Sequence, residues 1–196
     1  MEKVMAVAKS ALYAAGFTDE TGFFAGAFPA LADAIVKNHI FMERGVSETN
    51  YDYKQIIPYT VVKHKDAYLL LRRLNKQGEK RLHGMLSIGV GGHINENERR
   101  GGESMLIAGA LRELNEEVRV SYVQNPVFMG FLNDNGADVG RVHLGLVYLL
   151  TADNAAFTIN ETDKMEGGWA AADELADKLP AMEGWSRILI ESGFIC

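Results

Sequence analysis

Cysteine is almost absent from this chain of 196 residues, in which Cys196 is the single example. One cysteine cannot form a disulfide within the chain or build a cysteine-rich zinc site. A chain of this length also buries enough apolar surface to fold without such cross-links. The sequence therefore predicts a cytoplasmic protein in which any bound metal is functional rather than structural.

Long uncharged apolar runs are also lacking, and no stretch approaches the ~20 residues of a membrane-spanning helix. The apolar N-terminal segment is interrupted by Glu2, Lys3 and Lys9, which argues against a signal peptide. Basic residues are few, with 20 Lys and Arg against 26 Asp and Glu. Binding to long nucleic acids depends on basic residues and is disfavoured. A small phosphorylated substrate remains compatible, because a cation and a few arginines can meet its charge locally.

No repeat, low-complexity tract or proline-rich linker divides the chain, which contains four prolines. We expect one domain over residues 53–196, preceded by an N-terminal extension over residues 1–52 that is partly helical. Within the extension, Phe28, Leu31, Ile35 and Ile40 recur at near-helical spacing. Residues 43–52 are polar and are expected to form a loop. The sequence leaves the oligomeric state open, a homodimer included.

From residue 53 onward, short runs of β-branched and aromatic residues alternate with turn signals. They predict strands at residues 56–62, 67–73, 86–94, 126–132 and 142–150, the first two joined as a hairpin. Helical periodicity covers residues 104–117, then 170–179 and 185–192 on either side of Pro180. This order predicts an α/β fold with helices packed on a mixed sheet.

Three glutamates in the predicted helix 104–117 stand at positions i, i+3 and i+4. Glu113, Glu116 and Glu117 therefore share one helix face. Like charges repel at this spacing, and anions near a helix C-terminus oppose the helix dipole, so a bound divalent cation would relieve both effects. Carboxylates suit Mg²⁺ or Mn²⁺, whose coordination the phosphates of a substrate can complete. The pattern predicts a metal site for phosphate chemistry, with a solvated acidic surface as the alternative.

A glycine pair, Gly91 and Gly92, ends the predicted strand ahead of this helix. Glycines at such a point permit a tight turn and the close approach of the backbone to a ligand. An ordinary turn between strand and loop explains the pair equally well when it is considered alone.

Residues 92–120 resemble the Nudix box, in which a glycine, five residues, a glutamate and seven residues precede Arg-Glu-aliphatic-any-Glu-Glu-any-Gly-aliphatic. The residues that match the second half in register are Arg112, Glu113, Leu114, Glu116, Glu117 and Val120. Arg119 stands where the family has the glycine that ends the helix. A left-handed cap favours glycine over arginine, so we expect a different helix exit in this chain.

The first half of the box departs further, because Gly92 and Arg112 are separated by six more residues than in the family. Two glutamates compete for the remaining box position. Glu98 keeps the five-residue spacing from Gly92, whereas Glu103 follows a glycine and lies within one residue of the required distance from Arg112. We favour Glu103, and we expect the lengthened loop to shape substrate access.

The resemblance extends beyond the box. Residues 53–62, 69–73, 81–95 and 142–148 are together similar to a bacterial subgroup of predicted MutT-family phosphoesterases, and residues 165–175 extend the match. It implies an α/β/α sandwich and a Mg²⁺- or Mn²⁺-dependent hydrolase that cleaves a phosphoanhydride bond in a nucleoside-diphosphate-linked or related small molecule. The alternative is a Nudix-fold sensor that binds a nucleotide without cleaving it. Isopentenyl diphosphate isomerisation, found in one branch, is disfavoured because it requires a cysteine at the site.

Residue roles are also implied by the resemblance. Glu113, Glu116 and Glu117 would hold the metal ion, while Arg112, Glu103, Glu116 and Glu117 would take part in catalysis. We expect Arg112 to pair with Glu116 one turn further along the helix.

Outside the helix, the family often adds another acidic residue, for which Glu166 and Asp138 are candidates. Glu166, Gly91, Gly92, Arg72 and Arg73 are predicted to contact the substrate. Strand alternation allows only one of the two arginines to face it. We expect His93 and His143 to be structural or hydrogen-bonded rather than metal ligands.

Overall fold

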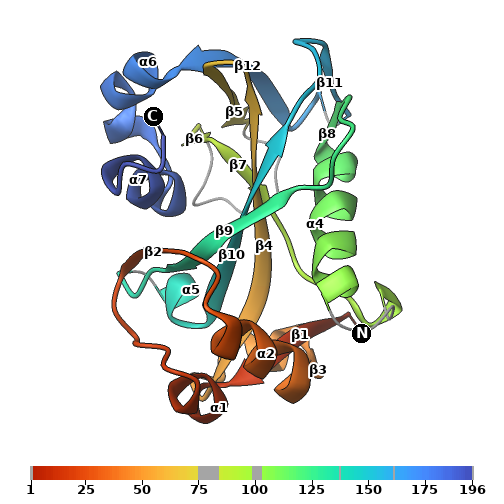
Figure 1. Ribbon diagram of the computed structural model, residues 1–196, viewed down its shortest axis with the longest axis vertical. Helices are drawn as coiled ribbons and strands as arrows, with labels where there is room; N and C mark the ends of the chain where they lie inside the picture. Colours follow the sequence, from red (N-terminus) through yellow and green to blue (C-terminus); the bar gives the residue numbers. More distant parts are fainter. Residues whose placement is uncertain (1, 75–83, 99–102, 137, 161, 196) are drawn as a thin grey trace.

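A mixed sheet forms the centre of the molecule, for which the computed structural model describes residues 2–74, 84–98, 103–136, 138–160 and 162–195 (Figure 1). Its main path runs in the order β12 (Met165–Ala171), β5 (Ala67–Arg73), β4 (Tyr53–His64), β10 (His143–Thr151), β9 (Val127–Asn133) and β2 (Gly22–Ala25). Strands β4 and β10 are parallel, and the other neighbours on this path are antiparallel. The expected mixed sheet is confirmed.

Shorter strands extend this sheet on both sides of β4. Strand β1 (Lys3–Ala8) pairs with β3 (Ile40–Glu43) and with β4, while β7 (Gly89–Gly91) also pairs with β4 and β6 (Leu86–Ser87) pairs with β5. A separate ribbon joins β8 (Val118–Val120) to β11 (Phe157–Ile159). The predicted hairpin between β4 and β5 is confirmed, and its turn places Lys65 at φ 52°.

Helices cover both faces of the sheet, as an α/β/α sandwich requires. Helix α4 (Glu103–Glu117) lies on one side in Figure 1, whereas α6 (Ala172–Asp177) and α7 (Gly184–Glu191) lie on the other. Alternate residues of β10 separate the layers: Leu146 packs in the core cluster that includes residues of α4, and Val147 packs in the cluster of α6 and α7. Short turns complete the fold as α3 (Arg44–Ser47), η2 (Glu96–Glu98), α5 (Asp138–Arg141) and η3 (Leu179–Ala181).

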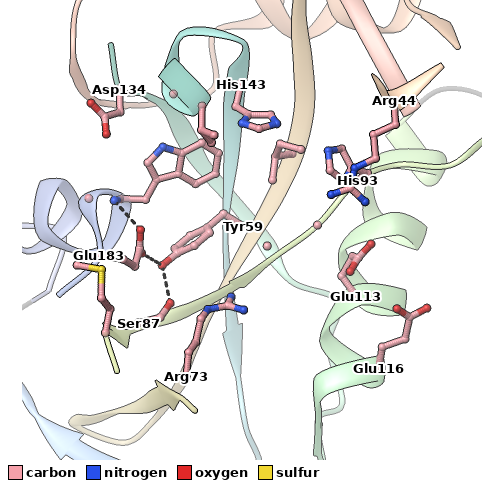
Figure 2. A pocket seen from close by; sticks show the side chains of 18 of the residues that line it. Arg44, Tyr59, Arg73, Ser87, His93, Glu113, Glu116, Asp134, His143 and Glu183 are labelled. Atoms are coloured by element: carbon pink, nitrogen blue, oxygen red, sulfur yellow. Dashed lines mark hydrogen bonds between the residues drawn. The ribbon is translucent and has the colours of Figure 1, made fainter. Parts of the chain in front are cut away.

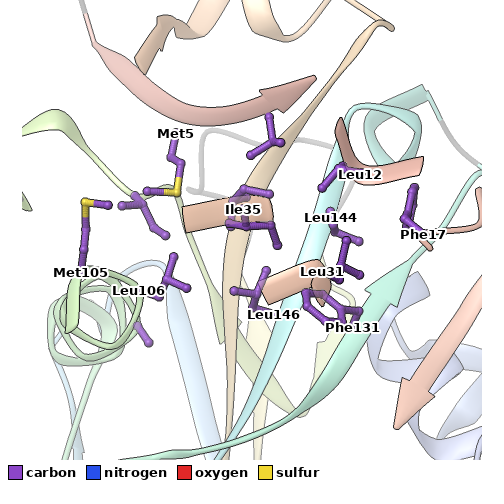
Figure 3. Packing of buried hydrophobic residues seen from close by; sticks show 14 of the residues in the cluster. Met5, Leu12, Phe17, Leu31, Ile35, Met105, Leu106, Phe131, Leu144 and Leu146 are labelled. Carbon is purple, nitrogen blue, oxygen red and sulfur yellow. The ribbon is translucent and has the colours of Figure 1, made fainter. Parts of the chain in front are cut away.

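The N-terminal 52 residues are integrated into the main body. They contain α1 (Lys9–Ala14) and α2 (Pro29–Asn38), and they also supply β1, β2 and β3. Figure 3 shows Met5 and Ile35 of this segment packed in one cluster with Leu106 of α4 and Leu146 of β10. The loop expected at residues 43–52 is wrong in part, because Arg44–Ser47 form α3. The segment therefore shares the hydrophobic core of the main sheet.

Two further details differ from the sequence-based expectations. The strand expected at residues 86–94 is split into β6 and β7. The helix expected to begin at residue 170 begins at residue 172, and β12 precedes it. Strand β12 was not predicted, because it contains the glycine pair Gly167 and Gly168, and glycine is uncommon within strands. Among the described residues, no helix is long and apolar enough to cross a membrane.

Candidate active site

A cavity of about 700 Å³ opens between α4, the end of β7 and α7 (Figure 2). Glu113 and Glu116 enter it from α4, Trp185 from α7, and Arg44 from the N-terminal segment. Its floor includes Tyr59 of β4. The predicted catalytic helix and the N-terminal segment thus line the same space.

Arg112 is the centre of an ionic cluster on the wall of this cavity. Its Nη1 atom donates to Glu116 Oε1 at 3.0 Å, its Nη2 atom lies 2.7 Å from Glu113 Oε1, and its Nε atom donates to Glu98. Nη2 also donates to the carbonyl oxygen of His93 at 2.6 Å. One guanidinium thus orients three carboxylates and the loop that follows Gly92, and the expected pair of Arg112 with Glu116 is present.

Gly92 makes room for Glu113. A Cβ atom at this position would overlap the Glu113 carboxyl group, so the two groups could not keep their present positions if residue 92 had a side chain. Gly91 is also closely packed, with a Cβ position 3.0 Å from the Tyr59 ring. Burial raises the pKa of Glu113 against the opposing pull of Arg112. The glycine pair therefore brings the backbone against a carboxylate that is partly removed from water.

The structure brings Glu98 to Arg112. Glu98 ends η2, its side chain is largely buried, and it accepts a hydrogen bond from the backbone N–H of Asn95 at 3.2 Å. Glu103 begins α4, and its side chain lies outside the described part of the structure. The contact corresponds to the five-residue spacing from Gly92, so the six extra residues lie between Glu98 and Arg112. The catalytic roles of both glutamates remain predictions.

Glu117 faces a different partner from the other two helix glutamates. Its carboxylate lies 3.9 Å from Nη1 of Arg73, and both side chains are largely buried. Within the described ranges, no three acidic, histidine or cysteine side chains are close enough to hold a metal ion as they stand. The three glutamates share a helix face, but only Glu113 and Glu116 are found among the cavity-lining residues.

The two arginines at the end of β5 point in opposite directions, as strand alternation requires. Arg73 lines the cavity. Arg72 instead lies on the surface, where its Nε atom is 3.6 Å from Glu166 Oε1 of the neighbouring β12. Neither Arg72 nor Glu166 is among the residues that line the cavity. Of the two arginines, Arg73 faces the cavity, and substrate contact by either remains a prediction.

Arg119 does not occupy a left-handed cap. Helix α4 ends at Glu117 and continues directly into β8, where Arg119 pairs with Thr158 in an extended conformation. A side chain is tolerated there without backbone strain. The different helix exit that we expected from Arg119 is thus found in the structure.

Two histidines line the cavity as hydrogen-bonded groups. His93 Nε2 lies 2.8 Å from Oε1 of the buried Gln55. Burial and the nearby Arg44 lower the pKa of His93 to about 4, and burial together with His93 lowers the pKa of His143 to about 3. Both rings are therefore neutral near pH 7. The other acidic candidate, Asp138, is exposed and lies 3.8 Å from Arg141.

Several cavity residues were missed by sequence reasoning. Arg44 is remote in sequence from the box, and Trp185 lies in a helix for which the sequence indicates no functional role. The Tyr59 hydroxyl lies 2.7 Å from Glu183 Oε1, and burial raises the pKa of Tyr59 well above its usual value. Glu183 also accepts from the backbone N–H of Trp185 at 2.8 Å and caps α7. The polar Tyr59 within a hydrophobic strand was the one available signal.

Comparisons with known proteins agree with this fold, although no family model matches the chain. Protein YmaB from Bacillus subtilis is 35% identical over 156 residues, which is 76% of either chain. The crystal structure of Tm1382, a protein assigned to the Nudix hydrolases, is 30% identical with a TM-score of 0.84 over 97% of both chains. The chain therefore belongs to the Nudix hydrolase family.

More distant structures share the fold alone. The Nudix domain of NrtR from Shewanella oneidensis, solved with ADP-ribose, is 20% identical with a TM-score of 0.54 over 78% of this chain and 97% of that one. A bifunctional NMN adenylyltransferase/ADP-ribose pyrophosphatase from Francisella tularensis, solved with AMP and a Mn ion, is 14% identical with a TM-score of 0.53 over 72% of this chain and 41% of that one.

Proposed function

We propose that this protein is a Mg²⁺- or Mn²⁺-dependent hydrolase that cleaves the diphosphate of a nucleoside-diphosphate-linked or related small molecule. The observation that carries this proposal is the excess of negative charge around Arg112. One guanidinium faces the carboxylates of Glu98, Glu113 and Glu116, of which Glu113 and Glu116 line the cavity. An excess of this kind is costly unless a cation shares the site.

The donor set fits a hard divalent cation. Mg²⁺ commonly binds through one or two carboxylates and takes its remaining ligands from water and substrate phosphates. Glu113 and Glu116 would supply those carboxylates. The resemblance to the Nudix box implies that Glu117 would be a further metal ligand. When bound, the cation would supply positive charge for the diphosphate and activate a water molecule.

The other cavity residues have defined tasks in this proposal. Arg112 orients Glu113 and Glu116 through fixed donor atoms, and Gly92 lets the backbone approach the carboxylate closely. Arg73 would donate to phosphate oxygens, which a planar guanidinium can contact with two N–H groups. A cavity of about 700 Å³ suits a ligand of nucleotide size.

A screen of phosphoanhydride compounds in ¹⁸O-labelled water tests the proposal. With Mg²⁺ or Mn²⁺ present, we expect one phosphate product to carry the label, and we expect a chelator to stop the reaction. Asp33→Asn is a matched control, because this carboxylate is exposed, pairs with Lys37 and lies outside the described cavity lining. If nucleotides bind tightly in the presence of metal but no labelled product forms, the protein is a nucleotide sensor and not a hydrolase.

A further inference from the structure

Arg44 and His93 lie together on the cavity wall, next to the proposed phosphate site (Figure 2). Arg44 reaches this wall from α3, in the N-terminal segment. Its backbone N–H donates to the carbonyl oxygen of Glu2 at 3.0 Å. Its Nη1 atom donates to Glu2 Oε2 and its Nε atom to Glu48 Oε1, both at 3.0 Å. These contacts hold the guanidinium through Nε and Nη1, and among the described residues no partner is found for Nη2.

His93 contributes an acceptor at the same wall. The Oε1 atom of Gln55 can only accept a hydrogen bond, so the Nε2 atom of His93, 2.8 Å away, carries the ring hydrogen. Gln55 is fully buried, which holds the imidazole in this orientation. Because burial and Arg44 keep the ring neutral, its Nδ1 atom has a lone pair and no hydrogen.

The local charge argues against a second anion here. Arg44 already faces two carboxylates, Glu2 and Glu48, and neutral His93 adds no positive charge. A phosphate or carboxylate would meet net negative charge. A hydroxyl group, in contrast, can accept from Arg44 and donate to His93 at the same time.

The position of this pair indicates which part of a substrate it would contact. His93 directly follows Gly92, which packs against Glu113, and the carbonyl oxygen of His93 accepts from Arg112. We propose that Arg44 and His93 form a subsite for a hydroxyl group on the substituent attached to the diphosphate, so that the enzyme prefers diphosphates esterified to a sugar or polyol. This assignment rests on the proposed function, because it places the diphosphate beside Glu113.

Three compounds that share ADP test the subsite: ADP-ribose, the ethyl ester of ADP, and ATP, in which a phosphate replaces the sugar. We expect kcat/KM to be about tenfold or more higher for ADP-ribose than for the other two, because a buried polar site discriminates against groups that leave it unpaired. Arg44→Gln and His93→Gln should reduce this ratio toward one, mainly by raising KM for ADP-ribose. His93→Asn, whose side-chain oxygen can take the position of Nδ1, should retain more of the preference than His93→Gln.

Matched controls are Arg119→Gln and His39→Gln, which lie outside the described cavity lining and should leave the ratio unchanged. Thermal melting of each variant checks folding, because half-exposed ion pairs such as those of Arg44 contribute little to stability. Calorimetric binding to the same three compounds supplies a readout that does not need turnover.

The outcomes separate this inference from the proposed function. Equal hydrolysis of all three compounds, unchanged in the Arg44 and His93 variants, overturns the subsite and leaves the hydrolase intact. Selective binding of ADP-ribose that the variants abolish, without hydrolysis, supports the subsite and overturns the hydrolase. A preference for ATP, or no binding of ADP-ribose, overturns the subsite.

Discussion

Two clusters in this molecule surround a cation with oxygen atoms, and they differ in charge balance. Arg112 faces three carboxylates beside an open cavity. Lys54 is fully buried; its Nζ atom donates to Asn133 Oδ1 at 2.8 Å and to the Gly140 carbonyl oxygen at 3.2 Å, and lies 3.4 Å from Asp19. Its other acceptor is Asn135 Oδ1 at 3.3 Å.

This difference in charge indicates different roles for the two clusters. Around Lys54, the ammonium meets the Asp19 carboxylate and neutral oxygens, and the same carboxylate lies 3.0 Å from Lys9 Nζ, so negative charge is not in excess. The cluster also ties the loop that contains Asp19 to β4 and to the turn before α5. Around Arg112 the negative charge is in excess, and the excess faces the cavity. A buried cluster without excess negative charge needs no further cation, whereas a cluster with excess negative charge at a cavity is suited to binding one.

Removing Lys54 should produce the largest effect on stability. Lys54→Ala leaves Asp19 and the amide oxygens of Asn133 and Asn135 without their central donor. Breaking a buried ion pair in this way costs about 3–5 kcal/mol in the free energy of unfolding, which urea denaturation would measure. Lys37→Ala, at an exposed pair with Asp33, is the control and should change stability little. Equal losses in the two variants would contradict a structural role for the Lys54 cluster.

Neutralising a carboxylate of the Arg112 cluster should lower activity without lowering stability. Glu113→Gln and Glu116→Gln should each lower kcat by about 100-fold to 1000-fold, the size typical of a lost electrostatic contribution to a transition state. The free energy of unfolding without metal should hold or rise, because one of several mutually repelling charges is removed. Steady-state kinetics and urea denaturation of the same samples check both parts. Normal turnover in both variants would show that the charge excess has no catalytic use.

The two candidates for the first box glutamate should differ by a smaller factor. Glu98 contacts Arg112, so Glu98→Gln should disturb the orientation of Glu113 and Glu116 and lower kcat about 10-fold to 100-fold, as is typical for residues that orient metal ligands. Glu103→Gln should have little effect. If Glu103→Gln is the impaired variant, Arg112 does not act through the contact with Glu98.

Acid should weaken the Lys54 cluster through Asp19. Although burial opposes the shift, hydrogen bonds from Lys9 and Asn135 and the charge of Lys54 lower the pKa of Asp19 from 3.8 to about 2. A carboxyl group with a lower pKa in the folded state stabilises the fold above its unfolded pKa, and this contribution is lost as the pH falls toward the folded pKa. Stability should therefore fall between pH 3.8 and 2, and less steeply in Asp19→Asn. If stability falls equally steeply with pH in the wild-type protein and in Asp19→Asn, Asp19 is not the group responsible.

The sequence was sufficient for the helix and its charge pattern, because both follow from local spacing. Residues 104–117 lie in α4, and Arg112 pairs with Glu116 as expected. Hydrophobic runs also placed β4, β5, β9 and β10. These features depend on residues close to one another in the chain, so the spacing of apolar residues predicts them directly.

Contacts between distant segments were not predictable in the same way. The choice between Glu98 and Glu103 depends on how the lengthened loop folds back to Arg112, which counting residues does not determine. Arg44 approaches His93 only because β1 and β3 join the sheet beside β4. The N-terminal segment looked like an extension because its strands are short and pair with partners far along the chain.

The most direct test of the contrast between the two clusters is Mn²⁺ binding followed by electron paramagnetic resonance. The account predicts that the wild-type protein binds Mn²⁺, that Glu113→Gln and Glu116→Gln each weaken binding at least about tenfold, and that Asp19→Asn leaves the affinity unchanged. The account would be contradicted if Mn²⁺ bound equally well to all four proteins, or if Asp19→Asn alone weakened binding.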